Sequence, residues 1–220
     1  MIELQNVCKR YRVKNGWHTV LDNVNLRFEE GKSMGILGVN GAGKSTMIRI
    51  IGGAEQPDSG RVIRTSRVSW PIGFSGCFHG SLTGRENLRF VSRVYGADIR
   101  KVTDYVEDFA ELGDYMDMPI NTYSSGMRSK LAFGLSMAIG FDFYLIDEAY
   151  SVGDAAFKKK ADRALMEKAA TSTLIFVSHS MAAVKQNCAC GAVLNAGQLV
   201  YYPDVNEAIK EYTDICNAKR

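Results

Sequence analysis

The chain has 220 residues, of which 46% are hydrophobic and 23% charged, and its formal net charge is +3. This length suits one domain with a sizeable core, and the net charge is too small to indicate a nucleic-acid-binding surface. Five cysteines without a CxxC pair are typical of reduced thiols and disfavour a metal site with cysteine ligands. We expect no signal peptide and no transmembrane span, so a role at a membrane would require a partner protein.

The first third of the chain is expected to form mainly strands. Apolar and polar residues alternate over 2–7 and 19–28, and the short apolar run at 33–38 suits a buried strand. A helix is predicted over 47–53, and PDSG at 57–60 predicts a turn.

The middle of the chain, about 85–139, is predicted to be mostly helical because apolar residues recur there every three or four positions. Strands are predicted again at 141–147, 173–179, 192–197 and 198–202, with helices at 154–170 and 203–216. Such alternation indicates an α/β core, and the helical stretch then forms an inserted subdomain. We therefore expect one domain over 1–220 with a helical subdomain at approximately 83–140.

The segment GVNGAGKST, residues 38–46, matches the phosphate-loop pattern GxxxxGK[ST] between an apolar strand and a helix. Its glycines allow backbone N–H groups to face a phosphate, and the helix N-terminus adds partial positive charge. Lys44 is expected to reach the outer phosphates and Ser45 to supply an oxygen to Mg²⁺. A chance glycine-rich turn is the alternative, which the strand–loop–helix order disfavours. The predicted nucleotide-binding residues of this loop are Gly38, Asn40, Gly41, Ala42, Gly43, Lys44, Ser45 and Thr46.

The segment FYLIDE, residues 143–148, is an apolar strand that ends in two carboxylates. Asp147 is expected to hold Mg²⁺ through water, and Glu148 to accept a proton from an attacking water. Many strands end in acidic residues, and this pattern alone is therefore a weak signal. It becomes a strong one because the chain also has a phosphate loop.

Three further features have a functional and an ordinary interpretation. His179 ends the strand TLIFVSH and is either a surface residue or a neighbour of the γ-phosphate. Ser124, Ser125 and Gly126 in YSSGM form either an ordinary helix N-cap or a second phosphate-facing helix N-terminus. Tyr11 either stacks on an adenine ring or is a core or surface tyrosine.

The motifs GVNGAGKST, YSSGM, FYLIDE, GD at 153–154 and VSH follow the order of the nucleotide-binding domains of ABC transporters, and the resemblance covers essentially the whole chain. It implies an α/β fold: a P-loop NTPase, ABC-type ATPase core with an antiparallel β subdomain and an inserted helical subdomain. It also implies ATP and Mg²⁺ as cofactors, and a homodimer with two composite sites. By this likeness, Glu148 is the catalytic base and His179 steadies the γ-phosphate. Tyr11 stacks on adenine, Ser125 and Gly126 act on the partner's ATP, and Asp154 communicates between subunits.

A closer resemblance is carried by SWPIGFSGCFHGSLTGREN, NTYSSGMRSKLAFGLSMAIGFDFYLIDE and DEAYSVGD, which look like the ATP-binding subunit of bacterial capsular polysaccharide exporters. It implies an ATPase bound peripherally at the cytoplasmic face of the inner membrane, with a multi-span permease that handles the polysaccharide. An O-antigen or teichoic acid exporter, a non-transport ABC ATPase and a P-loop small-molecule kinase are the alternatives. About forty residues follow His179, and we expect no appended carbohydrate-binding module.

The stretch Trp70–Asn87 departs from the ABC pattern, because the family's usual metal-contacting glutamine is absent and Phe74 or Ser75 stands in its place. We expect the apolar, glycine-rich segment Trp70–Leu82 to be covered by the membrane partner. The alternative is that Trp70, Phe74 and Phe78 pack into the core.

Overall fold

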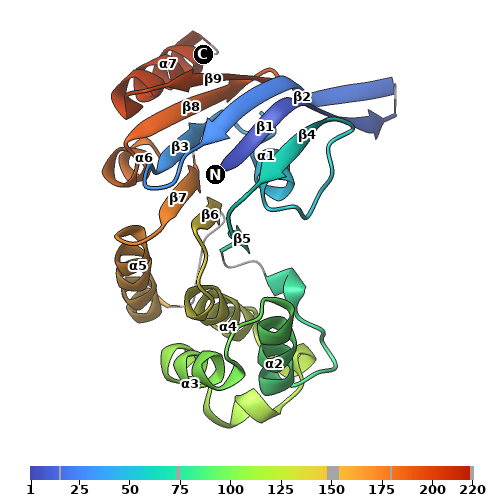
Figure 1. Ribbon diagram of the computed structural model, residues 1–220, viewed down its shortest axis with the longest axis vertical. Helices are drawn as coiled ribbons and strands as arrows, with labels where there is room; N and C mark the ends of the chain where they lie inside the picture. The colour runs from blue at the N-terminus through green and yellow to red at the C-terminus, as the bar shows by residue number, and fades with distance from the viewer. Residues whose placement is uncertain (15, 73–74, 148–153, 179, 219–220) are drawn as a thin grey trace. The chain divides into compact units, whose positions relative to one another are not determined.

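The computed structural model describes residues 1–14, 16–72, 75–147, 154–178 and 180–218. The chain divides by its internal contacts into two units (Figure 1). The first, here called the sheet unit, comprises Met1–Pro71, Phe141–Glu148 and Ser172–Arg220, and the second, the helical unit, comprises Ile72–Gly140 and Ala149–Thr171. The single-domain prediction with subdomain limits at 83 and 140 stays a prediction.

The sheet unit contains an antiparallel three-stranded sheet in the order β2-β1-β4. It consists of β1 (Ile2–Val13), β2 (Gly16–Phe28) and β4 (Ser59–Arg64). Ile2 pairs with Phe28 on one side and with Arg64 on the other. The alternating pattern predicted both long strands, whereas β4 was missed because it is mostly exposed and lacks regular alternation. The predicted turn at 57–60 overlaps the first two residues of β4, which begins at Ser59.

A six-stranded sheet in the order β5-β6-β7-β3-β8-β9 forms the rest of the sheet unit's framework. All neighbouring pairs are parallel except β8 with β9. Helices cover both faces, so the central strands are almost continuously apolar. The strands are β3 (Met34–Leu37), β5 (Val68–Pro71), β6 (Phe143–Asp147), β7 (Thr173–Val177), β8 (Cys190–Asn195) and β9 (Gln198–Tyr202).

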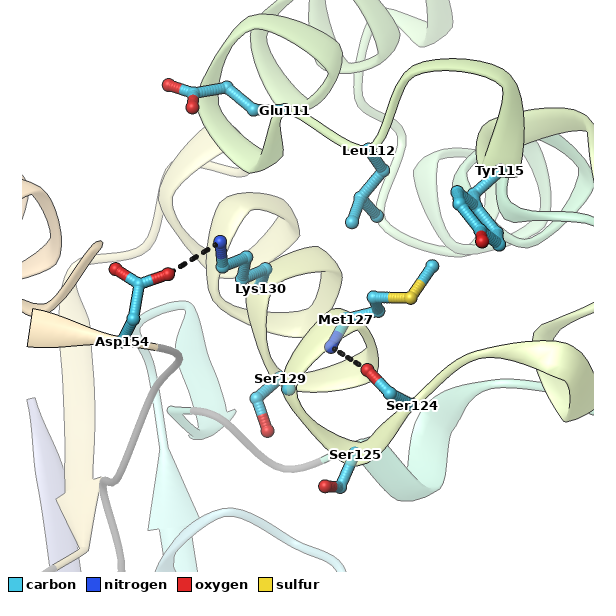
Figure 2. A pocket seen from close by; sticks show the side chains of 10 residues that line it. Glu111, Leu112, Tyr115, Ser124, Ser125, Met127, Ser129, Lys130 and Asp154 are labelled. Carbon is cyan, nitrogen blue, oxygen red and sulfur yellow. Dashed lines mark hydrogen bonds and ion pairs between the residues drawn. The ribbon is translucent and has the colours of Figure 1, made fainter. Parts of the chain in front are cut away.

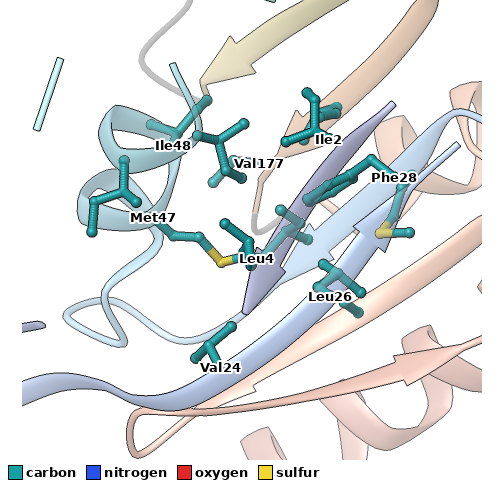
Figure 3. Close-up of a cluster of buried hydrophobic side chains, with 14 of the residues drawn as sticks. Ile2, Leu4, Val24, Leu26, Phe28, Met47, Ile48 and Val177 are labelled. Carbon is teal, nitrogen blue, oxygen red and sulfur yellow. The ribbon is translucent and has the colours of Figure 1, made fainter. Parts of the chain in front are cut away.

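Two hydrophobic clusters lie on opposite faces of this sheet, and β3 alternates between them. Ile36 joins the cluster of α1 (Lys44–Ile51) and the antiparallel sheet, while Leu37 joins the cluster with α6 (Met181–Asn187) and α7 (Val205–Ala218). In Figure 3 side chains from β1, β2, α1 and β7 point toward one another in the first cluster. Helix α1 is therefore anchored by its buried face, which positions the loop that precedes it.

The helical unit is built from short helices around a buried aromatic group. Thr83 and Glu86 form a capping box that starts α2. The elements are η1 (Ser75–Cys77), α2 (Gly84–Val94), α3 (Ile99–Ala110), η2 (Gly113–Asp117), η3 (Ile120–Thr122), α4 (Ser125–Ala138) and α5 (Ala155–Ala169). The sequence predicted α2 to α5 but not α6 of the sheet unit, which has only seven residues. Within the described ranges, no helix is both long and apolar enough to cross a membrane.

Phe133 is a fully buried member of the aromatic group in the helical unit, and its replacement by alanine tests how much that group stabilises the fold. Phe133 is fully buried, and its ring centroid lies 5.5 Å from that of Phe109 and 6.3 Å from that of Phe157. We expect Phe133→Ala to lower the free energy of unfolding by about 3–5 kcal/mol, measured by urea denaturation. Phe90→Ala is the control, because Phe90 is 58% exposed. Equal losses in both variants would contradict this prediction.

Candidate functional site

The phosphate-loop segment joins β3 to α1 and is held between β2 and β8. Gly41 and Gly43 adopt positive φ angles of 80° and 104°, which glycine tolerates best. A Cβ at Gly43 would lie 2.5 Å from Val20 Cγ1, and a Cβ at Gly38 would lie 2.6 Å from the carbonyl oxygen of Leu194. The backbone N–H of Ala42 donates to the Val39 carbonyl at 3.1 Å and closes the turn. The loop is thus a tight backbone cradle with no room for side chains at two of its glycines.

Lys44 places a buried positive charge inside this loop. It is 9% exposed, and its Nζ donates to the carbonyl oxygens of Gly38 at 2.6 Å and Val39 at 3.3 Å. Burial lowers the pKa of the Lys44 ammonium, and the negative charge of Asp147 acts in the opposite direction. A partly desolvated cation at a helix N-terminus is suited to bind an anion.

The strand order brings Asp147 to the same edge of the sheet as the loop. Asp147 ends β6 and pairs in register with Val177 of β7, which in turn pairs with Ile36 of β3. Because these strands are parallel, their carboxyl ends meet at one edge. Glu148 directly follows β6, and His179 lies two residues after the end of β7. Both residues lie outside the described ranges.

The oxygens expected to hold Mg²⁺ come from one hydroxyl and one carboxylate. Ser45 is exposed on the first turn of α1, and Asp147 is half-buried. Across the described ranges, no cluster of three or more His, Cys, Asp or Glu side chains is placed to hold a metal ion. The donor set fits a hard cation that keeps waters and takes its remaining ligands from a nucleotide's phosphate oxygens.

Tyr11 is fixed by its hydroxyl group next to the first turn of α1. This hydroxyl lies 2.6 Å from Glu55 Oε1 and 3.2 Å from Thr46 Oγ1, and the ring is half-buried. His18 is its cross-strand partner on β2. Tyr11 is therefore held in place at its hydroxyl group and packs, partly buried, against the core cluster of the sheet unit, which also contains the phosphate loop.

The Ser124–Gly126 segment lines a pocket in the helical unit. The Ser124 side chain accepts a hydrogen bond from the Met127 N–H at 3.2 Å, which confirms the predicted N-cap. Figure 2 shows the hydroxyl groups of Ser125 and Ser129 on the same side of α4. The pocket has a volume of about 600 Å³ and is lined by Glu111, Leu112, Tyr115, Ser124, Ser125, Gly126, Met127, Ser129, Lys130 and Asp154.

Asp154 connects the start of α5 to this pocket. Its carboxylate accepts from the N–H groups of Ala156 at 3.0 Å and Phe157 at 2.9 Å, and it pairs with Lys130 Nζ at 3.3 Å. The hydrogen bond from the Phe157 N–H and that from Lys130 hold the pKa of Asp154 below its ordinary value. Asp154 is thus ionised at neutral pH and links α4 to α5.

The structure brings together, in the sheet unit, the predicted residues Tyr11, Asp147 and the loop 38–46, while Ser124, Ser125 and Gly126 belong to the helical unit. Sequence reasoning missed Arg49 and Glu55, which contact Tyr11, and Lys130, which contacts Asp154. The contact between Arg49 and Thr46 could have been predicted, because residues three apart on a helix lie on the same face. Nothing in the sequence pointed to Glu55, which comes from an irregular segment.

Comparison with known proteins agrees with this architecture. The ABC transporter family profile matches residues 21–151. The structure resembles the dimeric ATP-binding cassette MJ0796, solved in a post-hydrolysis state bound to ADP and Pi. The TM-score is 0.73 with 24% identity, over 93% of this chain and 99% of that one.

Several relatives align over nearly the full length of both proteins. The polysialic acid transport ATP-binding protein KpsT of Escherichia coli is 52% identical over 96% of this chain and 98% of its own length. The capsule polysaccharide export ATP-binding protein CtrD of Neisseria meningitidis serogroup B is 47% identical over 98% and 100%. The teichoic acids export ATP-binding protein TagH of Staphylococcus haemolyticus is 36% identical over 96% and 87%. The chain therefore belongs to the ABC transporter family.

Proposed function

We propose that this chain is the ATP-hydrolysing subunit of an ABC exporter that drives capsular polysaccharide across the inner membrane. The observation that carries the proposal is the glycine cradle around buried Lys44, with Asp147 at the same sheet edge. The cargo is inferred from the names of KpsT and CtrD, which are more similar to this chain than the teichoic acid protein TagH. A teichoic acid or O-antigen cargo is the second candidate.

Hydrolysis is proposed to use the loop and two carboxylates, Asp147 at the end of β6 and Glu148 directly after it. The loop 38–46 binds the phosphates, and Lys44 neutralises charge on the outer ones. Ser45 and Asp147 would hold Mg²⁺, which supplies charge neutralisation at the phosphates when bound. Glu148 accepts the proton of the attacking water, and His179 steadies the γ-phosphate.

Two copies of the chain are proposed to form two composite sites. Ser124, Ser125 and Gly126 of one subunit then face the phosphates bound by the other, and Asp154 communicates between subunits. The pocket over the α4 N-terminus supports this, because it combines exposed hydroxyl groups with a helix end that favours anions. The dimeric MJ0796 cassette offers a precedent for two such subunits.

Mixed dimers test whether the Ser125 segment acts on the partner's nucleotide. Lys44→Ala and Ser125→Arg subunits are each expected to be inactive alone. Mixed dimers make up half of an equal mixture and have one of their two composite sites free of both substitutions, so mixing should restore about a quarter of the wild-type ATPase rate. The rate is measured as phosphate release. Failure of the mixture to regain activity, with dimers present by light scattering, would contradict composite sites.

The membrane partner is proposed to dock near Trp70–Leu82. Support differs along this segment: the Trp70 ring packs edge-on against Phe141, with centroids 5.4 Å apart, and Ile72 is buried. These contacts favour the core alternative for Trp70. Phe78 is half-buried while Gly76 and His79 are exposed, so the second half of the segment offers the docking surface. Phe74 lies outside the described residues, as does the side chain of Ser75.

Co-purification from gently solubilised native membranes tests the whole proposal. A tagged chain should retain a stoichiometric multi-span membrane protein, identified by mass spectrometry, and Phe78→Asp should lose it. Met166→Asp is the control, because Met166 is a 56% exposed residue of α5. Recovery of ribosomal or DNA-repair proteins in place of a membrane protein would favour a non-transport ABC ATPase. Retention of the membrane protein by Phe78→Asp would place docking elsewhere.

A further inference from the structure

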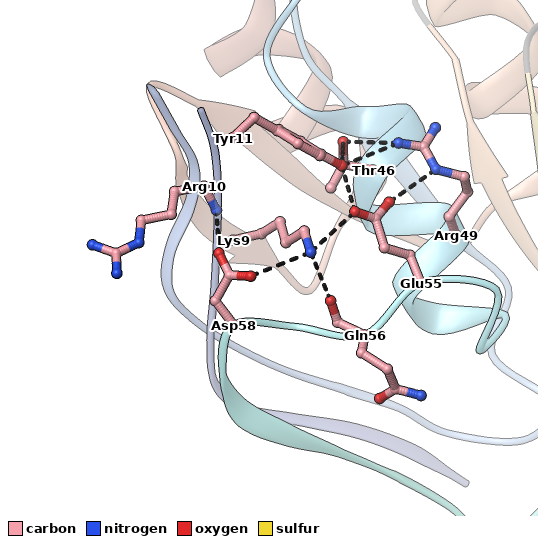
Figure 4. Close-up of polar contacts among 8 residues, drawn as sticks. All are labelled: Lys9, Arg10, Tyr11, Thr46, Arg49, Glu55, Gln56 and Asp58. Carbon is pink, nitrogen blue, oxygen red and sulfur yellow. Dashed lines mark hydrogen bonds and ion pairs between the residues drawn. The ribbon is translucent and has the colours of Figure 1, made fainter. Parts of the chain in front are cut away.

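A polar cluster surrounds the hydroxyl group of Tyr11 and joins three parts of the sheet unit. It consists of side chains from β1, from α1 and from the segment between α1 and β4 (Figure 4). Arg49 Nη2 lies 3.3 Å from both the Tyr11 hydroxyl and Thr46 Oγ1, and Arg49 Nε lies 3.0 Å from Glu55 Oε2. The Tyr11 hydroxyl is thus surrounded by Glu55, Thr46 and Arg49.

The direction of these hydrogen bonds follows from the chemistry of the groups. A phenol has one hydrogen to donate, and Glu55 as a carboxylate can only accept, so the 2.6 Å contact uses the Tyr11 proton. Arg49 can only donate, and the Thr46 hydroxyl is left to donate to the Tyr11 oxygen. The rotation of the Tyr11 side chain is therefore restricted at its far end as well as at its backbone.

Glu55 is itself held by charges. Lys9 Nζ lies 3.2 Å from its carboxylate and also contacts the Gln56 carbonyl at 2.9 Å and Asp58 at 3.3 Å. Burial alone would raise the pKa of Glu55, but the hydrogen bonds from Tyr11, Arg49 and Lys9 outweigh it and hold that pKa below its ordinary value. The segment 55–58 is therefore fixed to β1 with an ionised carboxylate pointing at Tyr11.

Thr46 connects this cluster to the phosphate loop. It is 6% exposed and follows Lys44 and Ser45 on the first turn of α1, so it moves with the loop that carries the buried lysine. Through Thr46 and Glu55, the ring of Tyr11 is placed at a fixed distance from the residues that would bind the phosphates. A rigid aromatic wall at that place suits the nucleoside part of a nucleotide.

We propose that Glu55 is a positioning residue, assisted by Arg49, that holds the Tyr11 ring against the nucleoside part of the bound nucleotide. The inference rests on the proposed function, because it requires that the loop 38–46 binds the triphosphate. Glu55 acts through the Tyr11 hydroxyl and does not itself touch the nucleotide. It therefore contributes to affinity for ATP and not to affinity for a triphosphate that lacks a base.

The test compares the binding of ATP with that of inorganic tripolyphosphate by calorimetry on the purified full chain. Glu55→Ala and Tyr11→Phe should each weaken ATP binding about tenfold, as expected for the loss of one hydrogen bond to a charged group. Tripolyphosphate binding should stay within about twofold of the wild type, since these variants leave the loop unchanged. Glu55→Gln keeps an acceptor oxygen for the phenol and should restore part of the ATP affinity.

Two controls separate positioning from general damage. Glu29→Gln changes an exposed glutamate of the same unit, outside the cluster, and should bind both ligands like the wild type. In the Tyr11→Phe background, Glu55→Ala should have little further effect on ATP affinity, because the hydroxyl through which it acts is already absent. A full additional loss in the double variant would overturn the inference.

The outcomes distinguish this inference from the proposed function. If Glu55→Ala weakened ATP and tripolyphosphate equally, Glu55 would act on the loop, and the positioning role would be wrong while ATP binding stood. If the wild-type chain bound neither ligand, the proposed function would fail, and the inference with it. ATP-selective weakening with recovery in Glu55→Gln would support it.

Discussion

Replacing Lys44 by alanine is expected to reduce ATP hydrolysis by about 10²–10³-fold, because a preorganised donor at developing charge contributes that much to a rate. Lys44 is buried in the loop and contacts the Gly38 carbonyl at 2.6 Å, so its ammonium group is oriented before a phosphate arrives. Alanine leaves the backbone cradle intact but removes its only side-chain cation among residues 38–46. Phosphate release at saturating ATP measures the effect.

The control for this experiment is Lys210→Ala, which removes one positive charge from the exposed side of α7. It should hydrolyse ATP at the wild-type rate, and the far-ultraviolet circular dichroism of both variants should match the wild type. If Lys44→Ala kept activity within about threefold of the wild type, the effect would be too small for the loss of a preorganised donor. That result would contradict the proposal that this loop binds the phosphates.

The second large effect is expected at Gly43, where alanine meets both an unfavourable backbone conformation and a lack of space. Its φ of 104° is strained for any L side chain, and the new Cβ would lie 2.5 Å from Val20 Cγ1 and 2.9 Å from the Val20 carbonyl oxygen. The loop or β2 must therefore shift. We expect Gly43→Ala to weaken ATP binding by more than about tenfold, since the backbone N–H groups lose their common direction.

Gly41→Ala separates the two causes. Gly41 also has a positive φ, 80°, but nothing lies within 4 Å of the position of its Cβ. This variant bears only the conformational cost of about 1–2 kcal/mol and should bind ATP more tightly than Gly43→Ala. Calorimetric titration with ATP measures both affinities. Equal losses at the two glycines would show that backbone strain alone decides the effect and that the contact with Val20 does not matter.

Local sequence patterns predicted most elements of this fold because they depend on neighbouring residues. Alternation predicted β1 and β2, and the glycines with Lys44 predicted the loop before α1. The small polar residues of YSSGM predicted the N-cap of α4, which Ser124 provides. Exposed or short elements such as β4 and α6 carry no strong period, so they were missed.

Short, ordered motifs were enough to predict the family, the phosphate loop and its charged residues. Which of those residues share a site depends on the tertiary structure. The parallel strand order places Asp147 near Lys44, although 103 positions separate them by their numbers, 147 − 44. The packing of the irregular segment 55–58 on β1 brings Glu55 to Tyr11. Contacts between distant segments depend on how whole elements pack, and no local pattern specifies that.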